Sequence, residues 1–220
     1  MSELQLPKQV IKAARKSPKN MIMYGPPKVG KTTALSQLDG CLIIDLEDGS
    51  DMVDALKVKA DSLAELAQVG SAIISEVWCE EEGKKMYQQT AMGKNFDKDN
   101  KGLSVLSLPN GAGYLYLRKA FMNWFHRLSK LAPHVIFIGH LKDKYLEDKA
   151  GKEVKANDLD LSGKLRSIAC ANADAIGYMY RQDGKTMLSF DSSNNDTAGS
   201  RCDHLIGKND ELDWGTIFID

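Results

Sequence analysis

Residues 21–33 of the chain read MIMYGPPKVGKTT, a short apolar run followed by a glycine-rich turn. The apolar run has the length of a buried strand, and the residues after the turn, ALSQL, can continue as a helix. Within the turn, Gly25, Gly30, Lys31 and Thr32 match the spacing G-x-x-x-x-G-K-[ST]. The segment therefore predicts a strand, a phosphate-binding loop (P-loop) and a helix in succession.

Each residue type in this motif has a physical reason. Glycines let the backbone curl so that successive N–H groups face bound phosphates, and the start of the helix adds the positive end of a dipole. Lys31 is expected to contact the β- and γ-phosphates of ATP and to act in catalysis, the Thr32 hydroxyl to ligate Mg²⁺, and Thr33 to reach the α-phosphate. The alternative is a glycine turn without a ligand. The predicted nucleotide-binding residues are Gly25, Pro26, Pro27, Lys28, Val29, Gly30, Lys31, Thr32 and Thr33.

A second apolar run, residues 41–44 (CLII), predicts a buried strand followed by acidic residues. Ligands of open α/β sheets bind at the carboxyl ends of the strands. Glu47 is therefore expected to be the catalytic base that polarises a water for attack on the γ-phosphate. Asp45 points to the same side of an extended strand, and we expect it to hold Mg²⁺ through water. The alternative is a solvated acidic turn without a catalytic role.

His140 ends a third apolar run, residues 135–140 (VIFIGH), and so is expected at the same edge of the sheet. It is a candidate catalytic residue that hydrogen-bonds the γ-phosphate. The alternative is a histidine satisfied by backbone at the end of a strand. His126 and His134 have no such placement and are expected to be structural.

The remaining apolar patterns predict further elements. Helices are expected at residues 56–69, 114–131 and 162–171, the last with Ser162 as its N-cap. Strands are expected at residues 175–180, 186–190 and 216–219, the first two joined by a turn at Asp183-Gly184. Residues 141–161 are expected to form an exposed hairpin or a loop, and residues 83–113 a long insertion or mobile loop.

Composition indicates one soluble α/β domain over residues 1–220. The chain has 43% hydrophobic and 27% charged residues and a net charge of −1, which excludes a disordered or fibrous protein. No apolar run approaches the roughly 18 residues of a membrane span, and the start lacks a secretion signal, so a cytoplasmic location is expected. The four cysteines are far apart and favour neither a zinc site nor a disulfide framework.

The charge is uneven along the chain. The basic segment at residues 1–20 carries a net charge of +4, while residues 201–220, within the C-terminal strands predicted for 175–220, carry −3. Two solvated ends explain this, and so does head-to-tail attraction between subunits of a homo-oligomer.

Several segments resemble a known family. The sequence GPPKVGKTT followed by CLIIDLE resembles the RecA-like ATPase core, whose second strand carries a catalytic glutamate. VIFIGH followed by LKDK is similar to that family's sensor strand leading into a DNA-binding loop. Together with LPNGAGY and NADAIGYMYR, these segments resemble the small phage-borne RecA-like ATPases over roughly residues 18–206, a group that includes single-strand annealing proteins.

The resemblance implies a mostly parallel sheet flanked by helices, with a C-terminal β-hairpin extension. It implies an ATPase acting in phage DNA recombination, in the cytoplasm of a bacterial host, as a homo-oligomeric ring or filament. Glu47 would be the water-activating base, His140 the γ-phosphate sensor, and residues 142–160 would face single-stranded DNA.

The sequence departs from the family at one strand. The core normally has an apolar strand that ends in aspartate between the Glu47 strand and the His140 strand, and residues 72–76 (AIISE) are short and end differently. Either Asp45 takes over the outer shell of the metal, or the strand is degenerate, or a segment is lacking between about Gly70 and Ser75.

Two other functions are compatible with a P-loop. A small-molecule kinase would close an arginine-rich lid over its substrate, but the six arginines of this chain are not clustered. A nucleotide-binding interaction module with little hydrolysis is the other alternative. In an oligomer, a neighbouring subunit commonly supplies an arginine to the ATP site. The candidates for that role are Arg166, Arg181 and Arg201.

Overall fold

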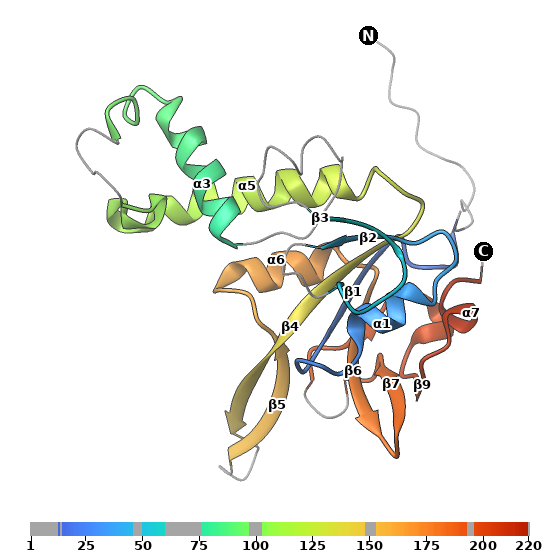
Figure 1. The fold of residues 1–220 in the computed structure, drawn as a ribbon. Helices are drawn as coiled ribbons and strands as arrows, with labels where there is room; N and C mark the ends of the chain where they lie inside the picture. The colour runs from blue at the N-terminus through green and yellow to red at the C-terminus, as the bar shows by residue number, and fades with distance from the viewer. Residues whose placement is uncertain are drawn as a thin grey trace, which may run out of the picture.

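The computed structural model describes residues 13, 15–45, 50–59, 76–96, 103–147, 153–192 and 196–219. The strands of its main sheet are β1 (Asn20–Gly25), β4 (Val135–Glu147), β5 (Glu153–Leu159), β6 (Ala175–Gln182), β7 (Lys185–Ser189), β8 (Gly199–Ser200) and β9 (Asn209–Glu211). Within the described chain they form one mixed sheet in the order β5-β4-β1-β6-β7-β9, with β8 paired to β6 (Figure 1).

Strand β1 lies at the centre of this sheet. It runs parallel to both of its neighbours, so that Gly25 lies opposite His140 of β4 and Tyr24 lies opposite Tyr178 of β6. A strand with neighbours on both sides and helices on both faces is apolar throughout, and Met21, Met23 and Tyr24 are 0% exposed. The outer pairings β4–β5, β6–β7 and β7–β9 are antiparallel.

Helices cover both faces of the sheet (Figure 1). Successive side chains of a strand point to opposite faces, so Met21 and Met23 pack into one core, while Ile22 and Tyr24 pack into another. The first core includes α1 (Lys31–Ser36) and α7 (Trp214–Ile217), and the second includes α5 (Gly113–Leu128) and α6 (Lys164–Asn172). Helix α3 (Glu76–Gln88) packs against α5. The predicted α/β fold with flanking helices and a C-terminal hairpin is confirmed.

Strands β2 (Leu42–Asp45) and β3 (Leu56–Lys59) form a separate two-stranded parallel sheet. This corrects the prediction of a helix at the start of residues 56–69, because Leu56-Lys-Val-Lys alternates with the two-residue period of a strand. It also corrects the expected position of β2 in the main sheet. Ile43 of β2 nevertheless packs in the same core as α1.

The first half of β4 borders a strand on one side only in the described chain. Residues 135–140 pair with β1, and β5 pairs with β4 only from Leu141 onward. The family's aspartate-ending strand was expected before β4 in chain order. Residues 60–75, between Lys59 and α3, lie outside the described part of the chain.

Other differences concern local signals. Residues 83–113 are not one long loop: α3 extends to Gln88, and the 3₁₀ helices η1 (Val105–Ser107) and η2 (Pro109–Gly111) follow. The predicted strand at 216–219 is instead the short helix α7, whose N-cap Asp213 accepts a hydrogen bond from the Gly215 amide at 2.9 Å. The N-cap of α6 is Gly163 rather than Ser162.

The helix predicted at 114–131 is confirmed as α5, and the two hairpins β4–β5 and β6–β7 are present. A further 3₁₀ helix, η3, spans Asp203–Leu205. No helix in the described ranges combines the length and the apolar character needed to cross a membrane.

Candidate nucleotide site

The loop between β1 and α1 has the backbone conformation that its glycines predict. Gly30, the N-cap of α1, has a φ of 102°, and Lys28 has a φ of 63°. Both values lie in the left-handed region, which glycine enters at little cost and other residues rarely adopt. The Ala34 amide then donates to the Gly30 carbonyl at 2.8 Å and closes the first helical turn. The predicted succession of strand, P-loop and helix is confirmed.

Gly25 begins the loop where two strands approach closely. A Cβ atom at this position would run into the backbone carbonyl oxygen of Met179 on β6. Only glycine therefore lets β1 end against β6 and turn directly into the loop.

Lys31 folds back over the start of the loop. Its ammonium group donates hydrogen bonds to the carbonyl oxygens of Gly25 and Pro26, each at 2.9 Å. The ammonium group thus lies at the mouth of the P-loop. Because the charged oxygens of a phosphate are stronger acceptors than peptide carbonyl oxygens, a bound phosphate could replace these carbonyls as the partner of Lys31. Thr32, which is half-buried, and Thr33, which is exposed, follow Lys31 in the first turn of α1.

His140 lies at the same edge of the sheet as the loop. It is opposite Gly25 in the parallel register, and its side chain is exposed. Its carbonyl oxygen accepts a hydrogen bond from the Asp160 amide at 3.0 Å. His134 has a structural contact, since its Nδ1 lies 2.8 Å from the Pro18 carbonyl oxygen.

The two acidic candidates are not brought to the site by the described residues. Glu47 lies outside the described part of the chain. Asp45 ends β2 and is opposite Lys59 in the two-stranded sheet, and its side chain also lies outside the described part. The structure therefore assembles the P-loop, Lys31 and His140 at one edge, and the roles of Glu47 and Asp45 stay predictions. The described ranges contain no group of three or more His, Cys, Asp or Glu side chains that could hold a metal ion.

Comparison with known proteins agrees with this geometry. A family model described as AAA domain matches residues 17–202, from just before β1 to just after β8. The chain belongs to this family. The AAA domain is a P-loop ATPase domain of the α/β class, which matches the strand, loop and helix described above. The comparison with curated proteins gives no match.

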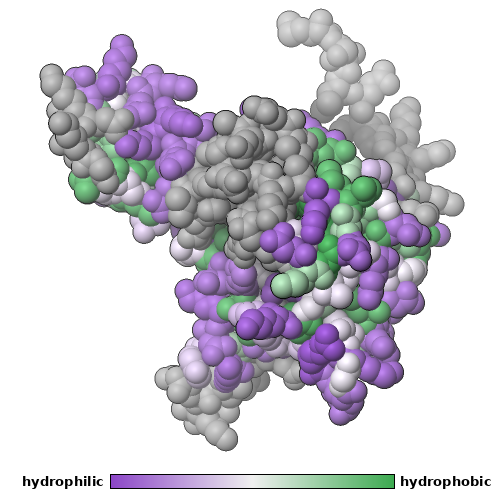
Figure 2. Space-filling view, in the orientation of Figure 1, coloured by the Kyte–Doolittle hydropathy of each residue, from purple (hydrophilic) through white to green (hydrophobic). Residues whose placement is uncertain are grey.

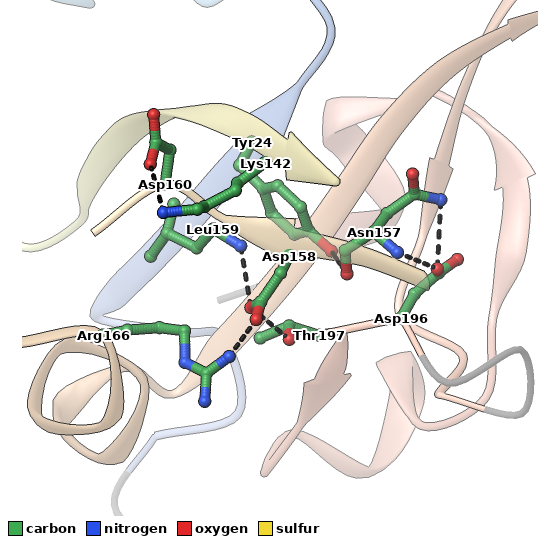
Figure 3. A network of polar contacts seen from close by, with 9 residues as sticks. All are labelled: Tyr24, Lys142, Asn157, Asp158, Leu159, Asp160, Arg166, Asp196 and Thr197. Carbon is green, nitrogen blue, oxygen red and sulfur yellow. Dashed lines mark hydrogen bonds and ion pairs between the residues drawn. The ribbon is translucent and has the colours of Figure 1, made fainter. Parts of the chain in front are cut away.

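A buried polar network connects the P-loop strand of this AAA domain to β5 (Figure 3). Tyr24 is the residue just before the loop, and its hydroxyl donates a hydrogen bond to the Asn157 carbonyl oxygen at 3.2 Å. Burial, with a smaller contribution from the charge of Asp196, raises the pKa of Tyr24, so the hydroxyl stays a donor. Asp196 in turn accepts from the backbone and side-chain nitrogens of Asn157 at 2.9 and 3.0 Å.

Asp158 is the centre of the same network and is only 4% exposed. Its carboxylate pairs with Arg166 of α6 and accepts from the Thr197 hydroxyl at 2.6 Å. A buried carboxylate needs such partners, because an unpaired charge in the interior is strongly unfavourable. No local sequence pattern marks this network, since its hydrogen-bonded partners lie up to 133 residues apart in the chain, as Tyr24 and Asn157 do.

The structure separates the three candidate arginines of the AAA domain. Arg166 is held by Asp158. Arg201 donates to the Ala171 carbonyl oxygen at 2.7 Å and lies 3.9 Å from Asp174, just before β6 and so at the opposite edge of the sheet from the P-loop. Arg181 at the other end of β6 donates to the Val29 carbonyl oxygen of the P-loop at 3.3 Å, within one chain.

Proposed function

We propose that the chain binds ATP in its P-loop and hydrolyses it to ADP and phosphate with Mg²⁺. The observation that carries the proposal is the fold of GPPKVGKTT as a strand-loop-helix with the Lys31 ammonium at its mouth. Membership of the AAA domain family supports the same function at the level of a nucleotide-binding ATPase. In this site the loop N–H groups and Lys31 bind the phosphates.

The residues present fit a magnesium ion. The hydroxyl of Thr32 is an oxygen donor next to the phosphate-binding Lys31, and hard cations prefer such oxygen ligands. Thr32 would hold the ion directly and Asp45 through water, and the ion would supply positive charge against the phosphates. Glu47 would orient and deprotonate the attacking water, and the exposed His140, opposite Gly25, would hydrogen-bond the γ-phosphate.

Turnover of ATP without an acceptor tests this proposal. The purified chain should release phosphate in the presence of Mg²⁺, and Glu47→Gln should abolish release while leaving nucleotide binding intact. Phosphate release that requires an added acceptor would favour a small-molecule kinase. Binding without any release would favour a nucleotide-binding interaction module.

We further propose that the chain acts in phage DNA recombination or single-strand annealing, as a homo-oligomer that binds single-stranded DNA in a nucleotide-dependent way. Helix α5 supports a polyanionic partner, because its sequence GYLYLRKAFMNWFHRL contains no Asp or Glu. Lys119 lies 5.8 Å from the centre of the Tyr116 ring, and Arg127 lies 5.4 Å from that of Trp124. Cationic side chains beside aromatic rings suit a single strand.

Among the described residues, neither Lys119 nor Arg127 of α5 forms an ion pair with a carboxylate. Their positive charge is therefore not neutralised within this part of the chain. In the view of Figure 2, hydrophilic side chains gather at the upper left, where α3 lies, with hydrophobic ones beneath them. On the β4–β5 hairpin, by contrast, Lys142 lies 3.7 Å from Asp160 and Lys155 lies 3.0 Å from Asp143. We therefore expect α5 to contribute more to DNA affinity than the hairpin segment 142–160.

A salt titration of DNA binding tests this part. Single-stranded DNA should bind more tightly with ATP than without, and the affinity should fall steeply as salt rises. The double variant Lys119→Glu, Arg127→Glu should weaken binding more than the charge-matched Lys142→Glu, Lys155→Glu. Absence of binding in every nucleotide state would contradict the DNA proposal and leave the ATPase proposal standing. Light scattering with and without ATP measures the molar mass of the particle in solution, which should exceed that of one chain if the protein is a homo-oligomer.

A further inference from the structure

Arg181 connects the β6–β7 hairpin to the P-loop of the same chain. Its Nε donates to the Val29 carbonyl oxygen at 3.3 Å, and its Nη1 donates to the Gly184 carbonyl oxygen at 3.2 Å. Its Nη2 lies 3.5 Å from the point that a Cβ on Gly30 would occupy. The guanidinium therefore lies directly against the Val29–Gly30 peptide.

Both partners of this guanidinium are fixed by the fold. Asp183 and Gly184 have φ values of 50° and 78°, the positive values that a tight two-residue hairpin turn requires, and Arg181 pairs with Thr186 across the hairpin. On the loop side, Val29 is only 5% exposed and packs in the core that contains Met179 of β6. The fold therefore supports the contact from both sides.

The geometry of the peptide unit gives this contact a consequence. In a planar trans peptide, the carbonyl of one residue and the N–H of the next point in opposite directions. Arg181 holds the Val29 carbonyl toward the hairpin, so the Gly30 N–H points away from the hairpin. A charged donor on the carbonyl also polarises the peptide and strengthens its N–H as a donor. The Gly30 N–H belongs to the loop segment that the sequence motif assigns to phosphate binding.

We propose that Arg181 is a positioning residue for the nucleotide site: from within the same chain, it orients the Val29–Gly30 peptide so that the Gly30 N–H faces the phosphates of the nucleotide. The proposal rests on the proposed function. It replaces the sequence-based expectation that Arg181 completes the site of a neighbouring subunit.

Nucleotide affinities of three variants test the proposal. Arg181→Ala should weaken binding of ATP and ADP by roughly tenfold, the size of one lost charge-assisted hydrogen bond. The ATP and ADP affinities of Arg181→Lys should lie between those of Arg181→Ala and the unmodified chain, because one ammonium cannot replace the planar guanidinium that reaches both Val29 and Gly184. Arg201→Ala is the matched control, since that guanidinium also donates to a backbone carbonyl but at the opposite edge of the sheet. It should bind ATP and ADP like the unmodified chain.

The affinities for AMP and ADP distinguish a positioning role from a purely structural one, because a purely structural defect would weaken the binding of both nucleotides equally. AMP lacks the β-phosphate that P-loop N–H groups bind, so Arg181→Ala should bind AMP unchanged and melt at the same temperature as Arg201→Ala. Unchanged ATP affinity in Arg181→Ala, or an equal loss for AMP and ADP, would overturn the proposal. So would recovery of ATP binding when Arg181→Ala and Lys31→Ala chains are mixed, because that indicates action between subunits. If the unmodified chain itself does not prefer ADP over AMP, the proposed function fails instead.

Discussion

Both the fold and the proposed site require that residue 25 has no side chain. A side chain there would overlap the Met179 carbonyl oxygen, so β1 and β6 would have to separate. We expect Gly25→Ala to lower the free energy of unfolding by about 1–3 kcal/mol, the range for forced overpacking. Because the loop starts at this residue, ATP affinity should fall as well.

Denaturant unfolding and nucleotide titration of the same preparation measure both effects. Gly40→Ala is a matched control for the loss of a glycine, since a Cβ there meets nothing within 4 Å, although its φ of 69° carries a strain of its own. A Gly25→Ala chain as stable as the unmodified chain would contradict the close approach of the two strands.

Tyr24 gives the protein a pH dependence with a definite sign. Burial raises the pKa of Tyr24 above its ordinary value of 10.0, so its stabilising contribution is complete below pH 10 and is lost as the pH rises further. Tyr24→Phe should lower the free energy of unfolding by about 1 kcal/mol at pH 8, through the lost hydrogen bond to Asn157. It should also flatten the decline above pH 10.

Denaturant unfolding between pH 8 and pH 11 measures this dependence. Tyr114→Phe is the control for the loss of a tyrosine hydroxyl, because Tyr114 is 48% exposed. The same alkaline slope in Tyr24→Phe and in the unmodified chain would show that Tyr24 does not carry the effect.

At the residue level, the sequence predicts those functions that a local motif specifies. Gly25, Gly30 and Lys31 were identified because the phosphate-binding loop is one continuous segment. Arg181 was a candidate, but its place beside Val29 depends on the pairing of β1 with β6, which are about 150 residues apart in the chain. Asp158 was not identified, since no local pattern marks a carboxylate whose partners lie on other elements.

At the level of elements, the ion pair between Asp158 and Arg166 joins β5 to α6. Side chains of Asp158 and Arg166 are 6% and 32% exposed. Arg166→Ala should therefore lower the free energy of unfolding by about 2 kcal/mol, somewhat less than a fully buried pair would give. Lys142→Ala breaks the exposed pair with Asp160 and should change stability by less than about 1 kcal/mol.

A double-mutant cycle isolates the pair. Asp158→Asn combined with Arg166→Ala should be less destabilising than the sum of the two single changes, because the second change removes a charge already without its partner. Strict additivity in denaturant unfolding would show that the two side chains do not interact.

Elements with a strong period were predicted well, and short ones were not. Helix α5 shows apolar residues at three- and four-residue spacing, and the β6–β7 hairpin has its Asp183-Gly184 turn, so both were found. Strand β3 was assigned to a helix because Leu63, Leu66 and Val69, which follow it in the sequence, recur near helical spacing, and the four alternating residues Leu56–Lys59 were too few to outweigh them. Helix α7 was assigned to a strand because its β-branched residues are typical of strands, and the helix-starting signal of the N-cap Asp213 was not recognised.

At the level of the whole molecule, the α/β class follows from the sequence, as does the burial of the strand before the P-loop. Fully apolar runs are typical of strands covered on both faces, and the run before the P-loop is one of these. The strand order could not be derived, because it depends on long-range pairing. The placement of β2 in its own sheet with β3 shows this, since the sequence favoured the main sheet.

Calorimetric titration of ATP into the full chain, with and without Mg²⁺, tests the central claim most directly. The account predicts magnesium-dependent binding by the unmodified chain and a loss of at least about tenfold in affinity for Lys31→Ala, whose ammonium now bonds the Gly25 and Pro26 carbonyls at 2.9 Å. No magnesium-dependent heat from the unmodified chain, or identical titrations for both proteins, would contradict it.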